Sequence, residues 1–337
     1  MSLWIYPLIF ALTLLLTELV RRYAIKHNVI DIANERSSHT NPTPRGGGLG
    51  VVIVYSITIA LLAWYQYLET SLEIIILFTS LPLAIIGFID DHAHVSAKVR
   101  IVVHILTAST FVLIVGGVTQ IELFDSIITL GIVGTVLTII GLVWLINLYN
   151  FMDGIDGLAA IEAITATFFA GVCLYLLNPE SKLITQHWLF AASICGFLLL
   201  NFPKAKIFMG DVGSGFIGFM LGVLMLLSYQ ENEKMLWVWL ILLSVFIVDA
   251  TLTLTSRLFR KKNLFSAHNE HLYQKISNHI NSHLSTSIGV LSINVFILLP
   301  LALSVVFTDE DHLFVFLFTY VLIMLFWFVG QKKYTSK

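Results

Sequence analysis

Charged residues are scarce in this sequence. Only 12% of its 337 residues are Asp, Glu, Lys or Arg, whereas soluble globular proteins carry about a quarter. Hydrophobic residues make up 57% of the chain, and the mean hydropathy is +0.88. This composition excludes an ordinary soluble protein and predicts an all-α, polytopic membrane protein.

Cysteine is almost absent. The two cysteines, Cys173 and Cys195, lie within apolar runs and have no metal-ligand spacing, so we expect small core residues and no zinc or disulfide chemistry. The chain start lacks the basic segment and the small-residue cleavage site of a signal peptide, so we expect a retained first helix. No internal repeat, low-complexity tract or soluble domain is found, which predicts one integral membrane domain over residues 1–337.

The apolar runs predict about eleven transmembrane helices, because a bilayer core of about 30 Å needs roughly twenty apolar residues per helix. The expected spans are 3–20, 49–65, 72–89, 101–118, 127–147, 157–177, 186–201, 213–229, 235–255, 287–307 and 312–330. If the first span runs from outside to inside, seventeen of the 19 Lys and Arg residues fall on the cytoplasmic side. This positive-inside bias fixes the orientation and supports an odd number of spans.

The polar loops follow the same asymmetry. The segments that mix Asp, Asn, His, Gly and basic residues all fall on the cytoplasmic side: 21–48, 90–100, 147–157, 202–212 and 256–286. A site built there would meet cytoplasmic substrates and the inner leaflet together.

The stretch from Asn147 to Leu158 carries the densest polar pattern. Asn147, Asn150, Asp153 and Asp156 recur at every third residue, a spacing that places side chains on one drifting face of a helix. All four could therefore point into one small polar site. The alternative is a polar loop that only joins two membrane helices.

Asp90 and Asp91 close the third expected span. Two adjacent carboxylates near hydrocarbon are costly, so they indicate a divalent cation, a basic partner or a shifted pKa. The alternative is a helix end at the membrane edge. Lys98 and Arg100, at the mouth of the fourth span, would hold a phosphate or anchor the helix to anionic headgroups.

Asp211 lies in a glycine-rich turn, Phe208-Met209-Gly210-Asp211-Val212-Gly213-Ser214. Backbone N–H groups at a helix start favour anions, and the carboxylate favours a hard cation, so the turn suits a metal-bound diphosphate. An ordinary helix cap would explain Asp211 but not the glycines.

Two further loops are rich in cations. In the first, Arg36 and Arg45 beside the Gly46–Gly48 run would meet phosphate oxygens, although a flexible loop fits equally well. In the last, a helix over 268–284 would place His268, His271, Lys275 and His279 on one face. His268 and His271, beside the basic run, are the candidates for phosphate contact. His279 and His283 would then belong to an amphipathic interfacial helix.

Asp249 lies inside the ninth span. It is a functional candidate by its position in the membrane, unless it pairs with Arg257 or packs helices.

With these motifs in order, the sequence resembles the polyprenyl-phosphate N-acetylhexosamine-1-phosphate transferases of glycosyltransferase family 4. Asp90-Asp91 is similar to the aspartate-rich motif of that family, Asn147 to Leu158 to its Asn-x-x-Asn-x-x-Asp-Gly-x-Asp-Gly motif, and Phe208 to Ser214 to its Phe-Met-Gly-Asp-x-Gly-Ser motif. The segments Asn34–His39 and Pro44–Gly48 resemble most the branch that starts O-antigen synthesis.

The resemblance implies a role for each matching residue. Asp211 would bind Mg²⁺, or Mn²⁺ in its place, and Asp90 and Asp91 would handle the lipid phosphate and the metal. Asp153 and Asp156 would lie beside the nucleotide, oriented by Asn147 and Asn150, with Asn201 and Phe208 as uridine contacts. Arg45, Lys98, His271 and His268 would bind phosphates. The histidine motif departs from the family here, because His268-Asn269-Glu270-His271 replaces near-consecutive histidines.

The implied reaction is attack by undecaprenyl phosphate on the β-phosphorus of a UDP-N-acetyl sugar, which releases UMP and starts a surface polysaccharide such as O-antigen. The sugar would be GlcNAc or a 6-deoxy relative such as FucNAc or QuiNAc. The implied location is the bacterial inner membrane, with the site on the cytoplasmic face. The implied partners are the two substrates and the bilayer, not nucleic acid, and the oligomeric state is left open, with a homodimer as one option.

Three other functions compete with this one. An ion-coupled transporter would place polar groups at the bilayer midplane and show repeat symmetry, whereas these carboxylates cluster at one edge. CDP-alcohol phosphotransferases share Asp-Gly-rich sites, but their motif continues to Ala-Arg where this chain has Ala159-Ala160. A non-catalytic lipid-binding scaffold is the third alternative.

Overall fold

The computed structural model describes residues 3–32, 42–93, 95–124, 126–262, 268–308 and 312–335. The first-loop segment Asn34–His39, with Arg36, lies outside the described residues.

Helices account for most of the described chain, as the apolar runs predict. They are α1 Ile5–Lys26, α2 Gly48–Trp64, α3 Thr70–His92, α4 Ala97–Val115, α5 Gly131–Met152, α6 Leu158–Leu177, α7 Leu183–Asn201, α8 Asp211–Glu231, α9 Lys234–Leu242, α10 Ser244–Phe259, α11 Leu272–Ile280, α12 His283–Ile293, the π-helical turn η1 Asn294–Leu298, α13 Leu299–Phe307 and α14 His312–Thr335. Two short antiparallel hairpins were not expected: β1 Ile30–Asp31 with β2 Thr43–Pro44, and β3 Gln120–Leu123 with β4 Ser126–Thr129. Their registers pair Ile30 with Pro44 and Ile121 with Ile128.

The structure supports a polytopic membrane protein but does not confirm eleven spans. Among the described residues, eight helices are long and apolar enough to cross a bilayer, or nine if α9 and α10, which meet at a 65° bend, count as one span. The helix α2 has only 17 residues, and the last turns of α1 carry Glu18, Arg21 and Arg22, which shortens its apolar part. The fifth expected span begins too early, because 127–129 belong to β4 and α5 starts at Gly131.

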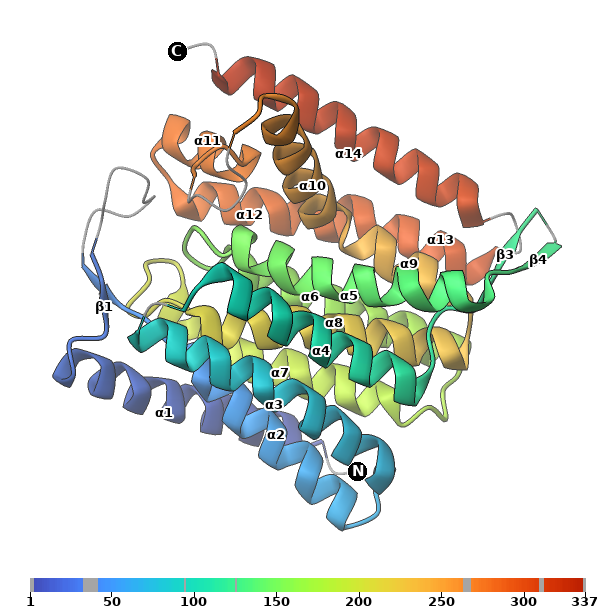
Figure 1. Cartoon of the computed structure of the whole chain (residues 1–337), viewed down its shortest axis with the longest axis horizontal. Coiled ribbons are helices and arrows are strands. Elements are labelled where there is room, and N and C mark those ends of the chain that lie inside the picture. Colours follow the sequence, from blue (N-terminus) through green and yellow to red (C-terminus); the bar gives the residue numbers. More distant parts are fainter. Residues whose placement is uncertain are drawn as a thin grey trace.

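The helices run across Figure 1 with the polar segments gathered at one end. The described chain passes through this polar end at 90–93, 95–97, 152–158, 201–211, 259–262 and 268–283, and the exposed strands β3 and β4 lie at the opposite end. The loops that the sequence assigned to one side of the membrane therefore do lie together.

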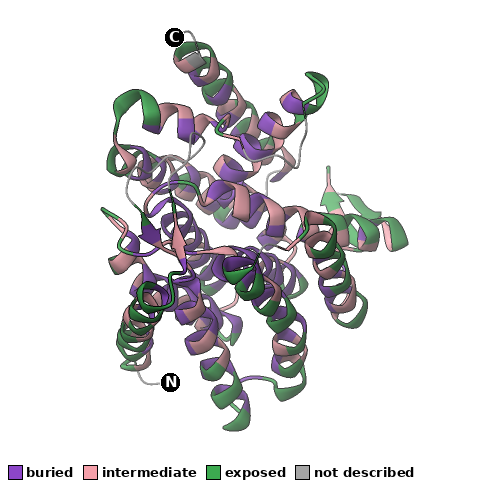
Figure 2. Cartoon of the chain, turned by 60° about the vertical axis from the view of Figure 1, so that its left-hand side comes forward, coloured by how far each residue is buried: buried purple, intermediate pink, exposed green. Residues whose placement is uncertain are grey.

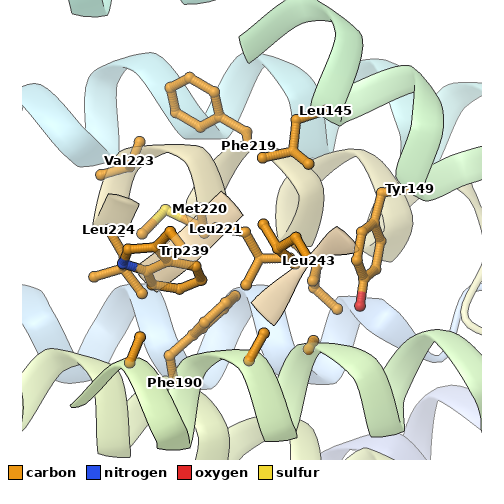
Figure 3. Close-up of a cluster of buried hydrophobic side chains, with 14 of the residues drawn as sticks. Leu145, Tyr149, Phe190, Phe219, Met220, Leu221, Val223, Leu224, Trp239 and Leu243 are labelled. Carbon is orange, nitrogen blue, oxygen red and sulfur yellow. The ribbon is translucent and has the colours of Figure 1, made fainter. Parts of the chain in front are cut away.

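Helix α8 forms the centre of the bundle. In its most apolar stretch 89% of the residues are buried, more than in any other candidate span, and Figure 2 shows this buried interior surrounded by helices exposed on their outer faces. Side chains Phe219 to Leu224 of α8 pack with Tyr149 of α5, Phe190 of α7 and Trp239 of α9 (Figure 3). Because α8 begins at Asp211, that carboxylate lies at the middle of the polar end.

Two glycines bring neighbouring helices into backbone contact with the start of α8. A Cβ on Gly87 of α3 would lie 2.4 Å from the carbonyl oxygen of Asp211, and one on Gly48 of α2 would lie 2.2 Å from Cα of Gly213. Only a residue without a side chain allows such an approach. The packing places Asp90 and Asp91, one turn beyond Gly87, beside Asp211.

Two carboxyl groups are fully buried inside the bundle, each beside an amide. Glu73 Oε1 accepts a hydrogen bond of 2.5 Å from Gln186 Nε2, and Glu162 Oε2 accepts one of 2.6 Å from Asn294 Nδ2 of η1. Buried polar groups are costly unless they are paired, so these contacts fix α3 against α7 and α6 against η1.

Candidate functional site

The buried carboxylate of Asp91 caps helix α8 from another helix. Its Oδ1 accepts from the backbone N–H of Asp211 at 3.0 Å, and its Oδ2 accepts from that of Val212 at 3.2 Å. The residue before α8 is Gly210, with φ +76°, which has no side chain to cap with. A Cβ there would lie 2.5 Å from Asp91 Oδ2, so the glycine leaves room for the carboxylate. The first N–H groups of a helix need an acceptor, and α3 supplies it.

Arg100 joins two of the predicted site carboxylates. Its Nη1 lies 2.8 Å from Asp90 Oδ2 and 2.7 Å from Asp211 Oδ2. The backbone N–H of Val95 donates to the other oxygen of Asp90 at 2.6 Å. One guanidinium thus balances two acids from α3 and α8. The position of Arg100 in the sequence predicts only an anchor or a phosphate contact, although a cluster of acids favours such a cation.

Arg45 holds the end of α3. Its Nε and Nη2 donate to the backbone carbonyl of Asp91 at 3.0 and 2.7 Å, and Nη2 also reaches that of Asp90 at 3.3 Å. A cation at a helix C-terminus is favourable because the last carbonyls have no partner in the helix. Arg45 therefore lies beside the carboxylates, and its predicted contact with phosphate stays a prediction. Lys98 is exposed on the following helix, and none of the hydrogen bonds or ion pairs described for the chain includes it.

Asp153 follows directly after α5 and faces the same group of acids. Burial raises its pKa to about 7, and the charges of Asp91 and Asp156 add to the rise. A carboxyl group with this pKa exchanges a proton near neutral pH. The three acids thus form one electrostatic unit.

The side-chain amides of Asn150 and Asn147, which precede Asp153, make different contacts. Asn150 Oδ1 accepts from Ser214 Oγ of α8 at 3.3 Å, which places Asn150 at the predicted site. Asn147 Nδ2 donates at 2.7 Å to the carbonyl of Val143 in its own helix. The third-residue spacing therefore predicts the position of Asn150 better than that of Asn147.

Asp156 ties together three parts of the polar end. Its Oδ2 accepts from the backbone N–H of Ala205 at 3.1 Å, and its Oδ1 lies 3.2 Å from His283 Nδ1. Its carbonyl accepts from Ser287 Oγ at 2.8 Å. Asp156 thus holds the loop before α8 and the start of α12, and His283 is a contact that the sequence analysis missed.

Asn201 and Phe208 organise the loop 202–210. Asn201 is buried; its Oδ1 accepts from Gly157 N–H and its Nδ2 donates to the carbonyl of Ile207, both at 2.9 Å. Phe208 is half-buried, and its N–H donates to the carbonyl of Pro44 at 2.8 Å. The side-chain amide of Asn201 is thus occupied by backbone groups, whereas the Phe208 ring is partly open.

His271 is buried next to the Asn147–Leu158 stretch. Its ring centroid lies 4.9 Å from that of His268, 5.7 Å from that of Tyr273 and 6.4 Å from that of Phe151. Its Nδ1 lies 3.8 Å from Asp249 Oδ1. Burial lowers the pKa of His268 to about 4, and the charges of His271 and Arg257 lower it as well. His268 is therefore neutral near pH 7.

Asp249 caps helix α11. Its oxygens accept from the backbone N–H of Leu272 at 2.9 Å and of Tyr273 at 3.2 Å, and from Trp327 Nε1 of α14 at 3.0 Å. Of the alternatives for this intramembrane acid, the contacts fit a helix-packing partner.

The predicted helix over 268–284 is wrong. Helix α11 covers only Leu272–Ile280 and ends where Asn281 adopts φ +51°, and a new helix begins at His283. His268 and His271 precede α11, so they do not share a helical face with His279. Asn in the left-handed region commonly ends a helix, which the apolar stripe alone did not indicate.

The acids suit a metal ion held jointly with a ligand. Within the described residues, no group of three or more His, Cys, Asp or Glu side chains is placed to enclose a metal. Mg²⁺ usually takes one or two carboxylates and completes its shell with water and phosphate oxygens. Asp211 and Asp90 are close enough to provide such a pair, since both reach one nitrogen of Arg100.

Comparison with known proteins shows the family of this chain. The family model described as glycosyl transferase family 4 matches residues 73–229. Undecaprenyl-phosphate alpha-N-acetylglucosaminyl 1-phosphate transferase of Pasteurella multocida is 33% identical over 301 residues, covering 85% of this chain and 79% of that protein. The chain belongs to the polyprenyl-phosphate hexosamine-1-phosphate transferases of this family.

Other members of the transferase family are similar over shorter stretches. The probable undecaprenyl-phosphate N-acetylglucosaminyl 1-phosphate transferase of Bacillus subtilis is 28% identical over 270 residues, 78% of this chain and 74% of that protein. Phospho-N-acetylmuramoyl-pentapeptide-transferase of a Wolbachia strain is 33% identical over 205 residues, 57% of this chain and 61% of that protein. The range that the family model matches, 73–229, includes neither Arg45 nor His271. It does include all five site carboxylates: Asp90, Asp91, Asp153, Asp156 and Asp211.

Proposed function

We propose that this membrane transferase moves an N-acetylhexosamine-1-phosphate from a UDP-sugar to undecaprenyl phosphate and releases UMP. The observation that carries the proposal is the gathering of Asp90, Asp91, Asp153 and Asp211 with Arg45 and Arg100 at one end of the bundle. In the reaction an oxygen of the lipid phosphate bonds to the β-phosphorus, and the bond from that phosphorus to the UMP oxygen breaks.

Charge is the main obstacle to this reaction, because two anionic substrates must meet. Mg²⁺, or Mn²⁺, held by Asp211 and Asp90 would neutralise the diphosphate when bound. Arg100 contacts the same carboxylates, and Arg45 lies at the adjacent end of α3. Their positive charge would offset the negative charge that develops on the leaving UMP.

The lipid phosphate needs little help from the protein to lose its proton. The second pKa of a phosphate is about 6, so the lipid phosphate is largely ionised at neutral pH. Asp153, with a pKa of about 7, is the carboxyl group suited to take the remaining proton. Asp90 is less suited, because its Oδ2 already contacts Arg100 Nη1 at 2.8 Å.

The orientation of the protein in the membrane is inferred from the basic residues at the polar end of the bundle. Each of the eleven expected segments is largely helical, and the positive residues favour the polar end. We therefore propose one membrane domain with the site on the cytoplasmic face of a bacterial inner membrane.

GlcNAc is the first sugar to test. The relatives from Pasteurella and Bacillus carry N-acetylglucosaminyl in their names, and the sequence also allows FucNAc or QuiNAc and a product used for O-antigen. The experiment incubates the purified protein with undecaprenyl phosphate, Mg²⁺ and each UDP-N-acetyl sugar in turn, and measures UMP. Release with one sugar above the others assigns the donor, and no release with any sugar would refute the transferase proposal.

A further inference from the structure

A cavity opens between α10, α11 and α14, away from the site carboxylates Asp90, Asp91, Asp153, Asp156 and Asp211. Its volume is about 600 Å³, and both α10 and α11 pack against α14, as Figure 1 shows at the polar end. Its lining includes three cations, Arg260, Lys275 and Lys332, and three aromatic side chains, Phe259, Trp327 and Phe328. None of the five site carboxylates lines it.

The three cations of this lining outnumber its one acid, Glu270. Glu270, the carboxylate of the lining, already contacts Arg257 and lies 3.0 Å from Lys262 Nζ, two cations outside the lining. Across the described ranges no ion pair includes Arg260 or Lys332. Lys275 Nζ has a neutral contact, Gln331 Oε1, at 2.5 Å.

Lys275 is the partly buried cation of the lining. Burial is the main cause that lowers its pKa; the charges of Arg260 and Lys262 lower the pKa as well, while those of Glu270 and Asp249 raise it. An anion between the cations would reverse this effect. The cavity thus has the electrostatics of an anion site.

The apolar part of the lining faces the membrane side. Phe259 is 82% exposed and Phe328 57% exposed, and Phe328 lies on α14, one of the candidate spans. Lys332 follows Phe328 by one helical turn. A ligand that fills the cavity would therefore have a negative headgroup joined to a hydrocarbon chain.

We propose that this cavity binds an anionic phospholipid, with its phosphate diester between Arg260, Lys275 and Lys332 and an acyl chain along Phe259 and Phe328. Basic pockets between transmembrane helices on the cytoplasmic side are known to hold anionic headgroups. The lipid is a second one, separate from the polyprenyl phosphate, whose phosphate must reach Asp211.

The test measures lipid retention by native mass spectrometry on the purified, delipidated chain. The probes are phosphatidylglycerol, phosphatidylcholine, undecaprenyl phosphate and inorganic phosphate. Wild type should retain phosphatidylglycerol in preference to phosphatidylcholine. Arg260→Gln and Lys332→Gln should each weaken that retention about fivefold, and the double variant about 25-fold, if each cation contributes about 1 kcal/mol.

Matched variants separate the site from general surface charge. Lys333→Gln removes the same charge one residue away, outside the lining, and should retain phosphatidylglycerol like wild type; Lys332→Arg should do so too. Equal retention of the two phospholipids, or equal loss in Lys333→Gln, would overturn the proposal. Displacement of the bound lipid by inorganic phosphate would also overturn it. A double variant that no longer binds undecaprenyl phosphate but still retains phosphatidylglycerol would overturn it as well.

Discussion

Asp91 and Asp211 are joined by a hydrogen bond of 3.0 Å, from the backbone N–H of Asp211 to Oδ1 of Asp91. This contact attaches the end of α3 to the start of the central helix α8. Asp91 thus positions Asp211, while Asp90 and Asp211 share Arg100.

Asp91→Ala should destabilise the protein by about 1–2 kcal/mol, because an N-terminal cap is lost. Asp91→Asn should cost less, since its amide oxygen can still accept one N–H. Thermal unfolding of both variants in the same detergent measures the difference. Equal unfolding midpoints for Asp91→Ala and wild type would show that the contact does not cap α8.

Arg100→Gln should lower UMP release by about 100-fold, as removal of one preorganised charge commonly does. It leaves the charges of Asp90 and Asp211 unbalanced, so raised Mg²⁺ should restore part of the activity. Arg100→Lys, which keeps the charge, is the control and should retain more activity. A Mg²⁺ titration of the three proteins tests this, and wild-type rates in Arg100→Gln would contradict it.

Asp153 should make stability depend on pH. Its pKa is about 7 in the folded protein and about 3.9 when unfolded, so the folded state binds more protons between these values. Stability should therefore fall as pH rises from about 4 to 7 and then level off. Asp153→Asn should flatten this part of the profile in thermal unfolding. An unchanged pH profile in that variant would refute the raised pKa.

Asn294→Ala should destabilise the bundle, because it removes the amide that donates to Glu162 Oε2 and to Thr165 Oγ1. A buried acceptor without a donor costs about 1–3 kcal/mol. A double-mutant cycle with Glu162→Ala should give a coupling of about 1 kcal/mol, the range seen between membrane helices. Additive effects on the unfolding midpoint would mean that the two side chains do not stabilise each other.

The sequence predicted the class of fold and the identity of the acids better than their contacts. Hydropathy located the helices, but the 65° bend between α9 and α10 and the end of α11 at Asn281 depend on tertiary packing and a single left-handed residue. Motif spacing brought Asp90, Asp153 and Asp211 into one region. It could not reveal that Arg100 bridges two of them or that Asn201 binds only backbone, because those contacts join residues far apart in the chain.

The most direct test of sugar-1-phosphate transfer follows both products of one reaction mixture by mass spectrometry. With undecaprenyl phosphate, Mg²⁺ and the preferred UDP-sugar, the wild-type protein should form undecaprenyl diphospho-sugar and UMP in equal amounts, and Asp211→Asn should form neither while remaining folded. UMP without the lipid product, or equal product from Asp211→Asn, would contradict transfer at this carboxylate site.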